Sequence, residues 1–272
     1  MSEYDVIQAS SKPVTRSGLV RDLQALGVEP GMVLVVHSSL SALGWVSGGP
    51  VAVILALEDV LRSYGTLVMP THTGHLSDPG GWSNPAVPDA WWDEIRSSMP
   101  AFDPDLTPSR GMGQIPECFR KQREVLRSNH PHFSFAAWGE QAAAVTEAHP
   151  LEYGLGEESP LGSLYALDAW VLLLGVGYEH NTSFHLAEYR ARYGKKYTVT
   201  RYAPVMLEGH RRWKPHEDIN IDSDDFAVLG REFQKRRAKS IRTGTVGQAR
   251  AQLFPQRACV DFAVRWMERT RR

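Results

Sequence analysis

His185 and Glu188 are the two residues whose types and spacing most directly suggest chemistry. On a helix, residues three apart lie on one face, so both side chains would point the same way. An imidazole titrates near neutral pH, and an adjacent carboxylate can fix its tautomer and raise its basicity. The pair is therefore a candidate general base with its orienting group. The alternative is a surface helix whose His and Glu are merely solvated, and spacing alone does not separate the two.

The residues before this pair predict a helix at the end of a buried strand. Residues 171–174 form an apolar run leading into Gly175 and Gly177, as in a strand covered on both faces. The polar run Asn181–Ser183 can accept hydrogen bonds from the free amides of a helix start. In open α/β sheets, ligands bind at the carboxyl ends of the strands. We therefore expect the His–Glu pair at the functional edge of a sheet.

Two earlier apolar runs end in polar residues in the same way. Residues 32–39 end in His37, Ser38 and Ser39, and residues 66–75 carry polar side chains after the apolar run. If the three strands are parallel and joined by right-handed crossovers, these ends build one site. His72 and His75 lack a third ligand at zinc-like spacing, so no metal site is predicted. For His37, hydrogen bonding to backbone groups at the strand end is an alternative to a binding role.

The remaining pattern predicts a single α/β domain over residues 1–272. Helices are expected at 15–26, 51–64, 115–123, 141–149, 161–167, 226–239 and 259–269. Residues 195–207 and 211–221 read as a hairpin added antiparallel to the main sheet. The Pro- and Trp-rich segment 75–116 is expected to cover the cleft.

Composition limits the function classes. The chain has 272 residues, 42% of them apolar, and a net charge of −1, which argues against a nucleic-acid binder. No apolar run is long enough to cross a bilayer, and the first residues lack a signal-peptide core, so no membrane association and a cytoplasmic location are expected. Cys118 and Cys259 lack metal or redox spacing and read as buried small side chains.

Several blocks together resemble the aminoglycoside 3-N-acetyltransferase family, whose members move an acetyl group from acetyl-coenzyme A to an amine of an antibiotic. The blocks are GVGYEHNTSFHLAE, LVVHSSLSALGWVSGG, GTLVMPTHTG, PAFDPDLTPSRGMGQIPECFR, SNHPHFSFAAWG and EESPLGSLYALDAWVLLLGVG. They lie in family order between about Leu19 and Met267. The expected fold is a three-layer α/β/α sandwich around a mostly parallel mixed sheet. It is distinct from the GNAT fold, whose coenzyme loop does not match residues 110–113.

The resemblance implies that acetyl-coenzyme A lies against the turn after the first strand and the small-residue turn that contains Arg110. The cofactor contacts expected on this basis are His37, Ser38, Ser39, Leu40, Thr71, Ser109, Arg110, Gly111, Met112 and Gly113. A glycine-rich turn before a helix can also cradle a phosphate on general grounds, with an arginine pairing the charge. No metal is implied.

A polycationic substrate should meet acidic side chains. The substrate contacts expected are Asp103, His132, Phe135, Glu158, Asn181, Glu217, Asp218 and Asp222. Asp103 can equally be a turn-forming residue beside Pro104, and a structural role is an alternative for His132. The partners expected are an aminoglycoside and acetyl-coenzyme A, for a monomer or homodimer.

The expected reaction is direct acetyl transfer to the 3-amino group of the 2-deoxystreptamine ring, conferring antibiotic resistance. In this reaction His185 removes a proton from the amine, and Glu188 orients the His185 ring. Ser38, Ser39 or Thr182 stabilises the oxyanion that forms from the thioester carbonyl. Three alternatives stay open: acetylation of another small-molecule amine, a hydrolase that uses His185 or a metal on His72 and His75, and a protein that only sequesters the cation. His180 has no assigned role.

Overall fold

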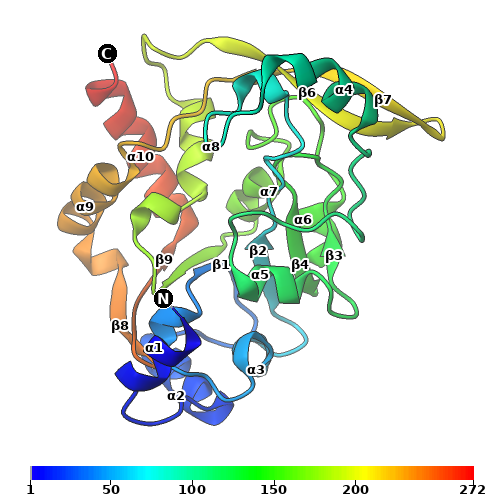
Figure 1. The fold of residues 1–272 in the computed structure, drawn as a ribbon. Helices are drawn as coiled ribbons and strands as arrows, with labels where there is room; N and C mark the ends of the chain where they lie inside the picture. Colours follow the sequence, from blue (N-terminus) through cyan, green and yellow to red (C-terminus); the bar gives the residue numbers. More distant parts are fainter. Residues whose placement is uncertain (1) are drawn as a thin grey trace.

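The computed structural model describes residues 2–272 and is built around a seven-stranded sheet (Figure 1). The strand order is β3-β4-β2-β1-β5-β9-β8. The strands are β1 (Val33–Ser38), β2 (Thr66–Pro70), β3 (Leu126–Arg127), β4 (Phe135–Gly139), β5 (Trp170–Leu174), β8 (Arg242–Val246) and β9 (Ala249–Pro255). β2 and the last four residues of β5 are buried, as expected of central strands covered on both faces.

The three strands that carry the predicted polar ends are parallel neighbours. β1 pairs in parallel with β2 on one side and with β5 on the other, so the carboxyl ends of all three meet. This confirms the mixed α/β sheet. β2–β4, β3–β4, β5–β9 and β8–β9 pair antiparallel, because β4 and β9 run opposite to the other five strands.

Helices cover both faces of the sheet and make three layers (Figure 1). They are α1 (Glu3–Ala9), α2 (Arg16–Leu26), α3 (Gly49–Leu61), α4 (Trp92–Ser98), α5 (Gln114–Phe119), α6 (Ala142–Thr146), α7 (Pro160–Ala166), α8 (Ser183–Arg190), α9 (Phe226–Arg236) and α10 (Gln256–Thr270). One core lies between the sheet and α2, α3 and α5. A second lies between the opposite face and α6 to α10.

The first long helix shows how closely the sequence specifies its local structure. The Thr15 side chain accepts a hydrogen bond from the Gly18 amide at the start of α2. Leu19, Leu23 and Leu26 form its buried stripe. Gly27 ends the helix with φ = 98°, a left-handed conformation that glycine adopts without steric cost. The sequence predicted this helix at residues 15–26, which agrees with its observed bounds.

The C-terminal third of the chain departs from the sequence prediction. The hairpin of β6 (Thr198–Leu207) and β7 (His210–Ile219) forms, but it is a separate two-stranded sheet and does not extend the main one. In Figure 1 it lies across one end of the molecule, beside α4. β8 and β9, which were not predicted as strands, complete the main sheet instead.

A cluster of buried aromatic side chains lies beneath α8. Phe184 is fully buried and contacts the Tyr178 and Phe226 rings, with centroids 6.3 and 5.3 Å away. α9 packs so closely on this cluster that a Cβ added at Gly230 would lie 2.0 Å from the Cγ atom of Tyr178. No helix among residues 2–272 has the length and apolar character needed to span a bilayer.

Candidate active site

The parallel strand ends converge on a tight turn. The amide of Ser39, just after β1, donates to the carbonyl of Leu174 at the end of β5, at 3.0 Å. Gly175 follows with φ = 74°, and a Cβ there would lie 2.6 Å from the Cβ of Ala42. Glycine is therefore required both for the backbone conformation and for the close approach of the two loops.

His185 and Glu188 form a hydrogen-bonded pair on α8. The helix begins where predicted, and the Asn181 side-chain oxygen accepts from the Ser183 amide at 3.2 Å. His185 Nδ1 lies 2.5 Å from Glu188 Oε2. The Glu188 side chain is completely buried, and 15% of the His185 side chain is exposed. If Nδ1 carries the proton donated to Glu188, Nε2 has a free lone pair and can accept a proton.

Two further histidines lie at the strand ends and stay neutral. Burial, together with the nearby His180 and His185, lowers the pKa of His37 to about 3. Burial has the same effect on His72, whose pKa is also about 3, and His185 and His37 add to it. Each ring has a buried Nε2 that makes no hydrogen bond within residues 2–272. The two imidazoles beside His185 are therefore uncharged at neutral pH.

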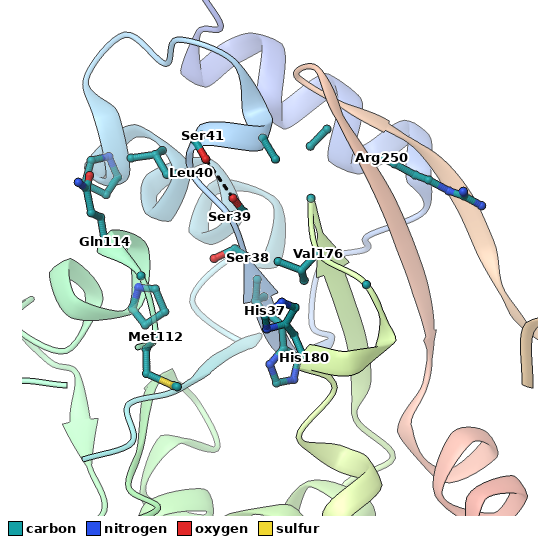
Figure 2. A pocket seen from close by; sticks show the side chains of 18 of the residues that line it. His37, Ser38, Ser39, Leu40, Ser41, Met112, Gln114, Val176, His180 and Arg250 are labelled. Carbon is teal, nitrogen blue, oxygen red and sulfur yellow. Dashed lines mark hydrogen bonds between the residues drawn. The ribbon is translucent and has the colours of Figure 1, made fainter. Parts of the chain in front are cut away.

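A cavity of about 1300 Å³ opens at the same strand ends (Figure 2). Seven of the ten predicted cofactor residues line it: His37, Ser38, Ser39, Leu40, Gly111, Met112 and Gly113. Thr182, at the start of α8, also lines it. The buried Ser38 hydroxyl has no hydrogen-bond partner in the described part of the chain and is available as a donor. The cavity thus joins the serine turn after β1 to the glycine turn before α5.

The other three predicted cofactor residues do not line the cavity. Thr71 is buried and hydrogen-bonds Ser134. Ser109 donates twice to Glu117, so it closes the turn before α5. The Arg110 side chain is exposed and makes no hydrogen bond or ion pair within the described residues. In the sequence, an arginine beside glycines resembles a phosphate ligand, but the turn directs only Gly111 to Gly113 to the cavity.

Two arginines that the sequence did not single out line the cavity instead. Arg231 comes from α9 and Arg250 from β9. In Figure 2, Arg250 lies across the cavity from Met112 and Gln114. Both side chains are exposed, and within residues 2–272 neither makes an ion pair. Sequence reasoning missed them because they reach the site only through the packing of α9 and the C-terminal strands.

Some of the predicted substrate contacts are exposed, and the others are buried or already hydrogen-bonded within the protein. Glu158, Glu217 and Asp222 are exposed acids, and the amide of Asp222 donates to Glu188 Oε1 at 2.9 Å. Asp218 is fully buried and bound by Tyr189 and Arg201. Asp103 accepts from the amides of Asp105 and Leu106, which is the turn-forming role. Phe135 and Asn181 are fully buried, so neither presents a surface to a ligand as the structure stands.

His132 belongs to a cluster of four buried histidines, His130, His132, His149 and His216. The rings of His130 and His149 have centroids 4.5 Å apart, and those of His132 and His216 lie 5.3 Å apart. His132 Nε2 contacts the carbonyl of Leu76 at 3.1 Å. His149 contacts Ser128 and the carbonyl of Gly154 through its two nitrogens. The cluster ties together the loops behind the site, which favours the structural interpretation of His132.

This cluster should make the fold sensitive to acid. Burial lowers the pKa of His132 and of His149 to about 4, from an ordinary value of 6.5. The unfolded chain then binds more protons between these values, so the free energy of unfolding falls as pH falls from 6.5. We expect up to about 1.4 kcal/mol per pH unit for each such histidine. Urea unfolding between pH 7.5 and 5 measures the slope.

Two variants make this expectation specific. His149→Gln should lower the slope of the unfolding free energy against pH by the contribution of one proton, about 1.4 kcal/mol per pH unit at most. His210→Gln should leave the slope unchanged, because His210 is exposed. Equal stability of the wild type at pH 6.5 and pH 5 would contradict the expectation.

Neither cysteine is an activated nucleophile. Burial raises the pKa of Cys259 to about 12, and burial also raises the pKa of Cys118. Both therefore carry their proton at neutral pH, whereas a thiolate is the reactive form. No group of three or more His, Cys, Asp or Glu side chains within residues 2–272 is arranged to hold a metal ion.

A mixed α/β sheet with a His–Glu pair and a large cavity at its parallel strand ends defines a candidate acid–base enzyme. The model of the aminoglycoside 3-N-acetyltransferase family matches residues 35–268. The chain therefore belongs to this family, whose members are named as transferases.

The relatives cover almost the whole chain. The SPbeta prophage-derived aminoglycoside N(3')-acetyltransferase-like protein YokD of Bacillus subtilis is 48% identical over 96% of this chain and 95% of its own. Aminoglycoside N(3)-acetyltransferase VII of Streptomyces paromomycinus is 39% identical over 98% and 96%.

Solved structures share the fold. The crystal structure of YokD from Bacillus subtilis matches with a TM-score of 0.96 at 46% identity, covering 98% of both chains. The AAC-IIIb binary complex with CoASH has a TM-score of 0.83 at 31% identity, covering 95% of this chain and 97% of that one. AAC-VIa bound to sisomicin has a TM-score of 0.85 at 30% identity, covering 96% and 99%.

Proposed function

We propose that this protein transfers the acetyl group of acetyl-coenzyme A to the 3-amino group of the 2-deoxystreptamine ring of aminoglycosides, in the cytoplasm and as a resistance activity. The observation that carries the proposal is the hydrogen-bonded His185–Glu188 pair on α8, the helix whose first turn at Thr182 lines a cavity of about 1300 Å³. The family membership and the relatives with bound CoASH and bound sisomicin support both substrates.

The cavity has the groups that a coenzyme A molecule needs. Acetyl-coenzyme A supplies a thioester acyl group and carries phosphates. Arg231 and Arg250 offer two unpaired guanidinium groups for the phosphates. The serine turn and Gly111–Gly113 offer polar groups and close backbone approach for the rest of the chain. With the phosphates at the two arginines, we infer that the thioester end lies toward His37 and Thr182, next to α8.

His185 performs the proton transfer. An aminoglycoside amine is largely protonated at neutral pH, and only the neutral nitrogen can attack a thioester carbon. His185 Nε2 removes a proton from the amine, while Glu188 holds Nδ1–H and stabilises the imidazolium that forms. Asp222, whose amide binds Glu188, places an exposed carboxylate near the pair for a second ammonium group of the substrate.

The oxyanion from the thioester carbonyl needs a donor. The Ser38 hydroxyl is buried without a protein partner, and Ser39 and Thr182 line the same cavity. We assign the oxyanion to this group of hydroxyls and the adjacent backbone amides. Transfer is direct in a ternary complex, since neither cysteine is ionised at neutral pH to form an acyl-enzyme.

The test is a thiol-release assay with acetyl-coenzyme A and a panel of aminoglycosides with and without a 3-amine. We expect free thiol only when acetyl-coenzyme A and a 3-amino compound are both present, and a product acetylated at that nitrogen. Thiol release without an amine would indicate a hydrolase. Tight aminoglycoside binding without thiol release would indicate a sequestering protein, and release with unrelated amines would indicate another acceptor. Each of these results contradicts the proposal.

A further inference from the structure

Arg271, the penultimate residue of the chain, lies in the same buried network as the His185–Glu188 pair. It follows the last residue of α10, and its amide donates to the carbonyl of Met267. Only 8% of its side chain is exposed. Its ring neighbours are Tyr193 and Phe226, at 5.4 and 5.9 Å from the guanidinium carbon, and Phe226 also packs on His185.

All five N–H donors of this guanidinium have acceptors. Nη1 donates to Glu188 Oε1 at 2.5 Å and to the Tyr193 hydroxyl at 3.4 Å. Nε and Nη2 donate to the Asp225 carboxylate at 2.8 and 2.5 Å. Nη2 also donates to the carbonyl of Asp222 at 2.7 Å. A fully used guanidinium holds its partners in a single geometry.

The Glu188 carboxylate receives three hydrogen bonds. His185 binds Oε2, while the Asp222 amide and Arg271 bind Oε1. Lys196 is close, but its ammonium group donates to backbone carbonyls at the end of α8 and not to the carboxylate. Within residues 2–272, Arg271 is therefore the permanent cation bonded to this buried carboxylate.

We propose that Arg271 is a positioning residue for the transfer reaction, which fixes the Glu188 carboxylate and lowers the pH at which the His185–Glu188 pair takes up a proton. The proposal rests on the proposed acetyltransferase function. It assigns to the residue that follows α10 a part in setting the working pH of the site.

Electrostatics gives the sign of the effect. A buried carboxylate bonded to a permanent cation is largely compensated, so it stabilises a proton on His185 less than a bare carboxylate would. Burial would lower the pKa of Arg271, but its hydrogen bonds to Asp225 and Glu188 outweigh this and raise the pKa. Arg271 is thus charged at every working pH. Without this charge, the coupled pair binds its proton at higher pH, whichever partner carries it.

The other groups that face the pair leave this sign unchanged. His37 and His72 face His185 from the ends of β1 and β2 and are neutral, and His180 is exposed on the turn before α8. Asp222 and Asp225 face Arg271 from the segment before α9. From the segment after α8, Tyr193 faces Arg271 and Lys196 lies beside Glu188. The two aspartates add negative charge, which also favours protonation once the arginine is removed.

The experiment compares the pH dependence of kcat/KM in the full-length wild type, R271A, R271Q, R271K and R272A. In R271A and R271Q, we expect the acidic limb to move up by about one to two pH units. At a pH below the acidic limbs of both the wild type and the variant, this shift predicts a roughly 10- to 100-fold loss of kcat/KM. R271K keeps the positive charge but loses the planar set of five N–H donors. Its acidic limb should therefore stay near the wild-type pH, while kcat falls because Glu188 is held less precisely. R272A should match the wild type, because Arg272 is exposed.

Coenzyme A affinity is the internal control. Arg271 does not line the cavity, so the Kd for coenzyme A should be unchanged in all the variants. A limb that stays at the wild-type pH in a folded R271A or R271Q would overturn the proposal. If both neutral variants fail to fold while R271K is fully active, Arg271 is a stability residue and the proposal is also overturned. Absence of thiol release in the wild type would instead remove the proposed function itself.

Discussion

Purified His185→Ala should bind coenzyme A with nearly wild-type affinity and lose turnover by about 10²- to 10⁴-fold. The cavity that would hold the coenzyme is lined by other residues, and His185 touches mainly Glu188 and Phe226. The substitution therefore removes the proton acceptor and leaves the coenzyme groups in place. Because the proton transfer occurs as the nitrogen attacks, the loss should fall on kcat rather than on KM.

A matched control distinguishes this loss from a general effect of removing a histidine. His210→Gln changes an exposed histidine at the start of β7 and should keep wild-type kcat. Coenzyme binding by calorimetry and steady-state rates for both variants, with an aminoglycoside that carries a 3-amine, give the comparison. Retained turnover in His185→Ala would take the role of base away from His185.

The strands that form the site were predictable because they are short apolar runs followed by polar residues. Residues 171–174 indicate a buried strand because the apolar run is short and ends at two glycines, and Asn181 marks the helix start by its capping chemistry. Strand direction was harder to predict. β2 and β4 are separated by 64 residues of mostly irregular chain, and nothing local in that segment indicates that β4 returns antiparallel. β8 has Val246 as its only apolar side chain, and β9 carries Arg250 and Gln252 between its apolar residues, so neither showed the apolar run of a buried strand.

The site residues also divide into those that a local sequence pattern reveals and those that only the tertiary packing brings to the site. The His185–Glu188 contact depends on a spacing of three within one helix, which the sequence shows directly. Arg231, Arg250 and Arg271 reach the site through the packing of α9, β9 and α10, which no local pattern reveals. Asp218 shows the opposite error. An acidic residue looked available for a cationic ligand, but Arg201 and Tyr189 already bind it inside the protein.

Phe184→Ala should be the most destabilising of the substitutions considered, with a loss of about 3–5 kcal/mol in the free energy of unfolding. Phe184 is fully buried directly before the candidate base and packs against Tyr178, which leads into α8, and Phe226, which begins α9. Truncation to alanine leaves a cavity that these rings cannot close without moving. A folded domain has only about 5–15 kcal/mol in total, so the variant should have a visibly lower urea midpoint.

Val228→Ala is the control on the neighbouring helix, because Val228 is 45% exposed and should change stability by less than about 0.5 kcal/mol. Chemical unfolding at pH 7.5 compares the two variants with the wild type. A loss below about 1 kcal/mol in Phe184→Ala would mean that the aromatic cluster does not hold α8. Under conditions where Phe184→Ala is folded, it should keep far more kcat than His185→Ala, since only the latter removes a group that exchanges a proton with the substrate.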